Sequence, residues 1–176
     1  MAAQTMADSQ FEAAVNANFG RLMALARAML GAPMRDGKQP EDLVQEALLN
    51  LFRHRDGYDW SDGGWSLMAK AVARNVISCR RRKVGQSLDA DAILLETLGN
   101  DADPSAEATM GETAASLRKA IESLPDDWRQ ALVLREQQGL AYRDIARLMQ
   151  ATESQVKTWL HRGRSRVAKI HTDGGG

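Results

Sequence analysis

The sequence predicts an all-α protein made of two small helical domains joined by an acidic flexible linker, the C-terminal domain being a helix-turn-helix. Its 176 residues are rich in Leu, Ala, Met, Arg, Asp and Glu and poor in β-branched and aromatic residues, a composition typical of helices. Apolar residues recur at helical spacing along most of the chain. We expect an N-terminal domain at residues 1–83, a linker at 84–115, the helix-turn-helix domain at 116–171 and a tail at 172–176.

Helices are predicted in the N-terminal domain at residues 11–30, 40–54 and 65–83. Each carries an apolar stripe at helical spacing, and we expect Phe19 and Phe52 to lie on the stripes of the first and second helices. The second helix begins with Pro-Glu-Asp. This is a favourable start because the proline ring suits the first helical position and the acidic residues complement the helix dipole.

The helix-turn-helix is predicted at the end of the chain. A short amphipathic helix at residues 142–149 is followed by a turn at 150–151 and a basic helix at 152–170. Gln155 stands three positions after Thr152, which is the capping-box pattern of a helix start. We expect the residues after 170 to be disordered.

Charge is segregated along the chain although 23 basic residues balance 23 acidic ones. Residues 65–83 are basic, residues 84–127 are acidic, and residues 128–170 are basic again. Two basic blocks separated by an acidic one predict two modules that face nucleic acid and a linker between them.

A turn-rich loop at residues 56–64 carries two aromatic residues, Tyr58 and Trp60. They can be tucked against the helices, or they can offer stacking surfaces to unpaired bases. The residues alone leave both interpretations open.

Several classes of protein are excluded by what the sequence lacks. It has no apolar run long enough to span a bilayer and no signal-peptide pattern at its start. The single Cys79 excludes an internal disulfide and fits a reducing cytosol. The histidines are far apart, and no phosphate-binding loop or supported carboxylate pair is present. We therefore expect a cytoplasmic protein that is not an enzyme, with no cofactor, no metal, no small-molecule substrate and no direct membrane insertion.

Several stretches, taken together and in order, resemble bacterial RNA polymerase sigma factors of the extracytoplasmic-function (ECF, group IV) family. They are EDLVQE at residues 41–46, VARN at 72–75, SLP at 123–125, GLAYRDIA at 139–146, VK at 156–157 and LHR at 160–162. The resemblance covers about residues 11–83 and 117–170. One helix-turn-helix alone is a weak signal, whereas these pieces in the family's order are a specific one.

The resemblance implies an alternative sigma factor, with core RNA polymerase, promoter DNA and an anti-sigma factor as its partners. The residues implied to contact the polymerase clamp are Asp42, Gln45 and Glu46. Those implied to bind melted minus-ten DNA are Tyr58, Arg74, Asn75, Arg81 and Arg82. Those implied to bind the minus-thirty-five duplex are Lys157, Thr158, Trp159, His161, Arg162 and Arg164.

Four residues depart from the family's pattern. Met68 and Cys79 stand where a tryptophan and an aspartate are often found, and we expect both to be variations in packing. Trp159 stands where an arginine is common, and Gln150 stands in the turn where a glycine is common. Trp159 is open to three interpretations: stacking on a sugar, packing on a neighbouring helix, or an altered promoter preference.

Two other functions are weighed against this one. A sigma-like decoy would bind an anti-sigma factor without reading promoters, and it would be expected to lose basic residues from its last helix, where Lys157, Arg162, Arg164 and Arg166 stand. A helix-turn-helix activator with a sensing domain would not explain the stretches at residues 41–46 and 72–75.

Overall fold

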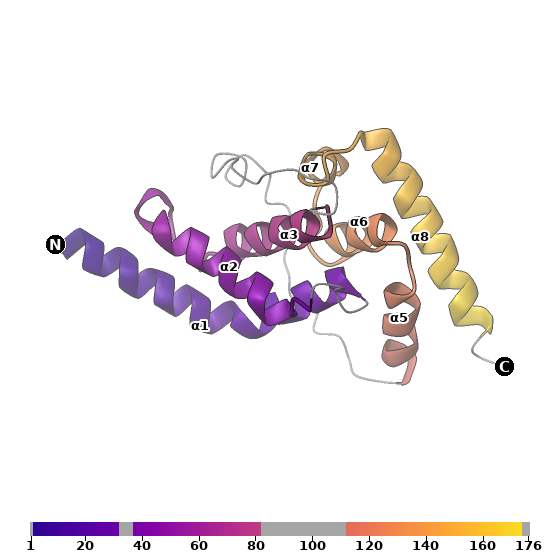
Figure 1. Cartoon of the computed structure of the whole chain (residues 1–176), viewed down its shortest axis with the longest axis horizontal. Helices are drawn as coiled ribbons and strands as arrows, with labels where there is room; N and C mark the ends of the chain where they lie inside the picture. Colours follow the sequence, from indigo (N-terminus) through magenta and orange to yellow (C-terminus); the bar gives the residue numbers. More distant parts are fainter. Residues whose placement is uncertain (1, 32–36, 82–111, 174–176) are drawn as a thin grey trace. The chain divides into compact units, whose positions relative to one another are not determined.

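The computed structural model describes residues 2–31, 37–81 and 112–173. Its elements are α1 (Ala2–Leu30), α2 (Pro40–Arg53), the short 3-10 helix η1 (Arg55–Gly57), α3 (Trp65–Arg81), α5 (Glu112–Glu122), α6 (Asp126–Glu136), α7 (Tyr142–Leu148) and α8 (Glu153–Asp173) (Figure 1). Every regular element among the described residues is helical, which confirms the all-α prediction. Most of the linker expected at residues 84–115 lies outside the described residues.

The helix boundaries follow the sequence pattern closely, with an exception at each end of the chain. The first helix begins at Ala2 instead of residue 11, because the residues before Phe11 include neither Gly nor Pro and continue the helix. The last helix continues through Asp173, so the expectation of disorder directly after residue 170 is wrong. The sequence between Gly163 and Gly174 contains neither Gly nor Pro, so no residue there is a strong helix breaker.

The chain divides into two units. The first comprises Met1–Arg27 and Arg35–Thr97, and the second comprises Ala28–Met34 and Leu98–Gly176. The last residues of α1 thus belong to the second unit. We describe each unit by itself.

The first unit is built on the packing of α2 against α3, which lie side by side in Figure 1. Leu43 and Val44 of α2 and Val72 and Val76 of α3 are fully buried, as the apolar stripes of the two helices predict. Burial of an aliphatic side chain contributes about 1.5–3 kcal/mol, so these stripes account for the pairing of the two helices.

Phe19 and Phe52 were expected on buried stripes, and that expectation is wrong, because each is 40% exposed. The ring of Phe52 lies at the margin of the core, tilted against Phe11 at 5.5 Å between ring centroids. The interior position beside Phe11 is taken by Trp60, whose ring meets that of Phe11 edge-on at 5.1 Å and is only 4% exposed. Nothing in the structure explains the exposure of Phe19.

In the second unit the long α8 packs against α5, α6 and α7 (Figure 1). Its inner face carries Val156 and Leu160, which are buried, and the buried Gly163. A Cβ atom at Gly163 would lie 3.7 Å from the Trp128 carbonyl oxygen, an ordinary van der Waals distance, so this buried position of α8 lies beside the backbone of α6.

The turn between α7 and α8 contains a strained residue. Gln150 has a φ of 47°, in the left-handed region that favours glycine. The capping box predicted at the start of α8 is confirmed. The Thr152 N–H donates to Gln155 Oε1 over 2.9 Å, and the Gln155 N–H donates to Thr152 Oγ1 over 3.2 Å.

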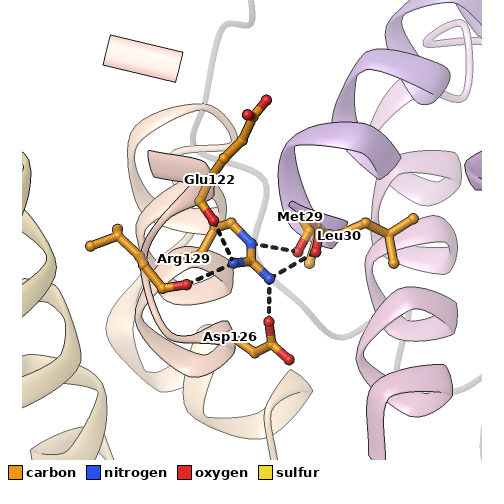
Figure 2. A network of polar contacts seen from close by, with 6 residues as sticks. Met29, Leu30, Glu122, Asp126 and Arg129 are labelled. Atoms are coloured by element: carbon orange, nitrogen blue, oxygen red, sulfur yellow. Dashed lines mark hydrogen bonds and ion pairs between the residues drawn. The ribbon is translucent and has the colours of Figure 1, made fainter. Parts of the chain in front are cut away.

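A buried arginine, Arg129, makes several hydrogen bonds within the second unit. The guanidinium of Arg129, which is 2% exposed, donates to the carbonyl oxygens of Met29 and Leu30 at the C-terminal end of α1 over 3.1 and 2.8 Å (Figure 2). It also donates to the carbonyl oxygens of Glu122 and Leu124 and pairs with the Asp126 carboxylate. These contacts satisfy helix-end carbonyls that have no partner within their own helix.

Gly31 makes room for this guanidinium. It has a φ of 64°, and a Cβ atom there would lie 2.5 Å from the Arg129 Cζ atom. Both the backbone conformation and the close approach therefore require glycine at this position.

We predict that Gln150→Gly stabilises the chain by about 0.5–1 kcal/mol, because it removes the cost of a left-handed conformation at a residue with a side chain. The measurement is the free energy of unfolding in urea. The control is Gln137→Gly, since Gln137 has an ordinary φ of −96° and the same change there should destabilise. Equal effects at the two positions would contradict the assignment of strain to Gln150.

We predict that Arg129→Met lowers the free energy of unfolding by about 2–4 kcal/mol, because it leaves several buried carbonyl oxygens without a donor. Asp126→Asn is the control. The Asp126 side chain is 45% exposed, and the carbonyl contacts of Arg129 remain, so a loss under about 1 kcal/mol is expected there. A loss as large for Asp126→Asn would show that the ion pair, and not the carbonyl contacts, carries the stability.

Candidate nucleic-acid interface

The solvent face of α8 carries most of the side chains that were expected to meet duplex DNA. Lys157, Thr158, His161, Arg162 and Arg164 are exposed, whereas Trp159 is half-buried. Val156 and Leu160 hold the opposite face against the other helices of the unit. The alternation of buried and exposed positions at helical spacing therefore places one polar and basic face of α8 toward solvent.

Arg162 and Arg164 also contact α6. The guanidinium carbon of Arg162 lies 5.8 Å from the centroid of the Trp128 ring. Arg164 donates to Glu136 Oε1 from Nε over 3.1 Å and from Nη2 over 2.5 Å. The Glu136 hydrogen bond raises the pKa of Arg164, so its charge is retained. An exposed ion pair of this kind contributes only about 0.2–1 kcal/mol, so a phosphate group can replace the carboxylate.

The acidic residues of α2 lie at its solvent side and are engaged within the first unit. Asp42 accepts a hydrogen bond from the Gln39 N–H over 2.8 Å, which caps the start of the helix. Glu46 pairs with Lys38 at 2.5 Å. Gln45 is exposed between them. The three residues implied to contact polymerase thus occupy one solvent-facing side of α2, at spacings of three and four.

Asn75 projects from α3 onto α2. Its Nδ2 donates to the Leu43 carbonyl oxygen over 2.8 Å and to Glu46 Oε2 over 3.3 Å. A residue expected to read DNA is therefore hydrogen-bonded to a residue expected to contact polymerase. Sequence reasoning placed these residues on different helices and did not predict that they touch.

The loop between α2 and α3 is folded around Trp60. Its indole N–H donates to the Arg55 carbonyl oxygen over 2.9 Å, and its ring lies so close to Gly64 that a Cβ atom there would be 2.7 Å away. Trp60 is therefore tucked into the core. Tyr58 is half-buried, with its ring edge-on to that of Trp60 at 5.9 Å.

Carboxylates shape the same loop. Asp59 Oδ1 accepts from the Ser61 N–H over 2.9 Å, and Asp62 Oδ1 accepts from the Gly64 N–H over 2.8 Å. The Ser61 hydrogen bond lowers the pKa of Asp59 and keeps it ionised. The loop therefore has a defined shape, and these acids act on its own backbone.

A further anchor of the loop carries no signal in the sequence. Asn18 of α1 is buried and donates from Nδ2 to the Gly63 carbonyl oxygen over 2.9 Å and to the Ala14 carbonyl oxygen over 2.8 Å. Asparagine within a helical pattern predicts neither burial nor a partner far along the chain.

The structure describes two of the three arginines that were expected to bind phosphate near the end of α3. Arg74 and Arg81 are half-buried near the C-terminal half of the helix. Arg82, expected to bind phosphate beside them, lies outside the described residues.

Arg135 of α6 fixes the turn that precedes α7. It donates to the Leu140 carbonyl oxygen over 2.9 Å, and its guanidinium carbon lies 5.3 Å from the centroid of the Tyr142 ring. It therefore holds the helix-turn-helix to α6.

Within the part of the chain that the structure describes, no group of three or more His, Cys, Asp and Glu side chains is placed to hold a metal ion. None of the described helices is long and apolar enough to cross a membrane.

Comparison with known protein families matches two sections of the chain. Residues 14–87 match the model of sigma-70 region 2, and residues 114–167 match that of sigma-70 region 4. The first section includes the α2–α3 pair and its loop, and the second includes the helix-turn-helix.

Individual proteins agree with these matches. The ECF sigma-E factor of Escherichia coli (strain K12) is 30% identical over 135 residues, which are 72% of this chain and 70% of that protein. The sigma-H factor of Pseudomonas aeruginosa is 28% identical over 144 residues, 77% of this chain and 75% of that one. Among solved structures, the sigma factor RpoE from Bartonella quintana, in complex with the anti-sigma factor NepR, is similar in fold, with a TM-score of 0.57 and 20% identity over 89% of this chain and 92% of that one.

The basic helix-turn-helix, the α2–α3 pair and the matches that cover both agree with one another. The chain belongs to the ECF sigma factors, the alternative sigma factors that bind core RNA polymerase and direct it to specific promoters.

Proposed function

We propose a division of labour in which the second unit reads the minus-thirty-five duplex and the first unit holds melted minus-ten DNA and the polymerase clamp. The observation that carries the proposal is the basic solvent face of α8, presented by a helix-turn-helix of intact geometry. The boundaries proposed for this division remain residues 1–83, 84–115 and 116–171, with a tail at 172–176.

For the minus-thirty-five element, α8 enters the major groove, which admits a helix and presents a distinct pattern for each base pair. Lys157, Thr158, His161 and Arg162 are all exposed on its solvent face. Arg164 exchanges Glu136 for a phosphate. Trp159 is half-buried at the edge of the face, which favours packing combined with contact to a sugar.

For the minus-ten element, Asn75 and Tyr58 hold a base that has left the stack. An extruded base needs hydrogen bonds to its edge and a flat surface for its ring. An amide offers both donor and acceptor, and the half-buried Tyr58 ring is held edge-on by Trp60 in a preformed loop. Arg74, Arg81 and Arg82 hold phosphates on this side.

For the polymerase clamp, Asp42, Gln45 and Glu46 form the contact surface on α2. Each is exposed, and two of them are acidic, which suits a basic partner surface. The chain itself performs no catalysis in this scheme and acts in the cytoplasm, where it meets polymerase and the chromosome.

We also propose that an anti-sigma factor binds this chain. The related Bartonella structure holds its sigma factor in complex with the anti-sigma factor NepR, which supports a partner of this class. A decoy function is disfavoured because the exposed basic residues of α8 are retained.

The test of the function is transcription in vitro with purified core polymerase and fragments of genomic DNA, with and without this chain. We expect promoter-specific transcripts that depend on the chain. A decoy would give none, and an activator would raise transcription only when another sigma factor is present.

We predict that Arg162→Ala weakens binding of the holoenzyme to a minus-thirty-five duplex by about 1–3 kcal/mol, because one base-edge contact is lost. Lys119→Ala on α5 is the control, since Lys119 is exposed and basic but lies off α8. Titration against matched and scrambled duplexes checks it. An equal loss on both duplexes would reassign Arg162 to a phosphate contact.

We predict that Gln45→Lys lowers the affinity for core polymerase about tenfold or more, because it adds a positive charge to a surface that faces basic groups. Gln45 is the cleanest probe, since Asp42 caps a helix and Glu46 holds Asn75. Asn16→Lys is the control, because it adds the same charge at an exposed position of α1 and leaves α2 unchanged. Equal affinities for the two variants would remove the clamp assignment.

A further inference from the structure

We infer that Glu46 couples polymerase binding to promoter reading by controlling the amide of Asn75. In the free chain Glu46 accepts a hydrogen bond from one of the two Nδ2 hydrogens of Asn75. When polymerase captures Glu46, that hydrogen becomes available to a base. This inference rests on the proposed roles of the two residues and adds a physical link between them.

The two hydrogen bonds of Asn75 differ in strength. The bond from Nδ2 to the Leu43 carbonyl oxygen is 2.8 Å long and partly buried, and it anchors the amide on α2. The bond to Glu46 Oε2 is 3.3 Å long and exposed to water. Water competes for the longer, exposed bond, so it is the one that exchanges.

Glu46 is placed to respond to a partner. Its side chain is 44% exposed, and its other oxygen pairs with Lys38 at 2.5 Å. The carboxylate is thus already held by a cation on one side and by Asn75 on the other. A basic group of the polymerase clamp that approaches α2 competes for the same carboxylate and draws it away from the amide.

The state of the amide decides what it can read. With both N–H bonds engaged, Asn75 can offer a base only its Oδ1 acceptor. Release of Glu46 restores a donor beside that acceptor, while Leu43 keeps the amide in place. A paired donor and acceptor discriminates base edges, as paired amide contacts to adenine do. By linkage, melted DNA bound to Asn75 also strengthens polymerase binding through Glu46.

The experiment measures binding of the free, full-length chain to single-stranded DNA by fluorescence anisotropy. The probe is a labelled oligonucleotide carrying the minus-ten non-template strand of a promoter found in the transcription assay above. Glu46→Ala should raise the affinity about 3- to 10-fold, the effect expected when one competing hydrogen bond is removed.

Two controls separate this effect from a simple loss of negative charge. Glu41→Ala removes the same charge from the same helix, where Glu41 is similarly exposed (47% for its side chain) and paired with Arg27. Glu46→Gln removes the charge but keeps an oxygen that can accept from Asn75. We expect both to gain clearly less affinity than Glu46→Ala.

The double variant Asn75→Ala with Glu46→Ala decides the mechanism, because the gain from Glu46→Ala should vanish when the amide is absent. A gain that persists, or a gain equal to that of Glu41→Ala or Glu46→Gln, overturns the coupling. The proposed role of Asn75 is tested separately by Asn75→Ala alone in the holoenzyme. If promoter opening is unchanged there, the base-reading role fails; if opening is lost but Glu46→Ala behaves like its controls, only the coupling fails.

Discussion

The packing of α2 against α3 is the constraint on which the N-terminal half of the molecule depends. The buried stripes that include Leu43 and Val72 set the distance between the two helices. At that distance the Asn75 amide reaches the backbone of α2, and the loop that joins the helices closes around Trp60. One apolar seam therefore positions the surface that we propose faces polymerase, the amide that we propose reads a base, and an aromatic loop.

The second unit meets a different constraint, because α8 must both close a core and present the basic face that we propose binds DNA. Val156, Leu160 and Gly163 lie on the buried side of α8, with Gly163 beside Trp128 of α6. Basic side chains on the solvent side of α8 also make contacts in the free chain. Arg162 lies over the Trp128 ring, and Arg164 is hydrogen-bonded to Glu136. Such contacts restrict the long side chains before DNA arrives, which lowers the entropy lost on binding.

Helix positions and family were predictable because apolar periodicity, capping residues and turn residues are local signals. The Thr152–Gln155 capping box and the start of α2 at Pro40 are of this kind. Interactions between residues distant in sequence were not predictable. No pattern indicated that Asn75 bonds to Glu46, or that Asn18 holds the loop. Phe52 was misassigned because periodicity gives a helix face but does not say how far the core extends.

The same difference between signals within one helix and contacts between distant residues applies to the candidate interface. Residue types and their order predict which side chains can face polymerase and promoter, because most of the family's stretches lie within single helices. Their engagement in the free protein depends on tertiary structure. Arg164 would be counted as a free surface charge from the sequence, yet it pairs with Glu136.

The fit between Gly31 and Arg129 has a consequence for how this chain can diverge. A side chain at position 31 would have to displace the guanidinium of Arg129, because its Cβ atom would lie 2.5 Å from the Arg129 Cζ atom. A lineage that first replaces Arg129 with a shorter residue is released from that clash, although the left-handed backbone at position 31 still favours glycine. Tolerance of a side chain at position 31 therefore depends on residue 129, whose own replacement forfeits the carbonyl contacts that Arg129 makes.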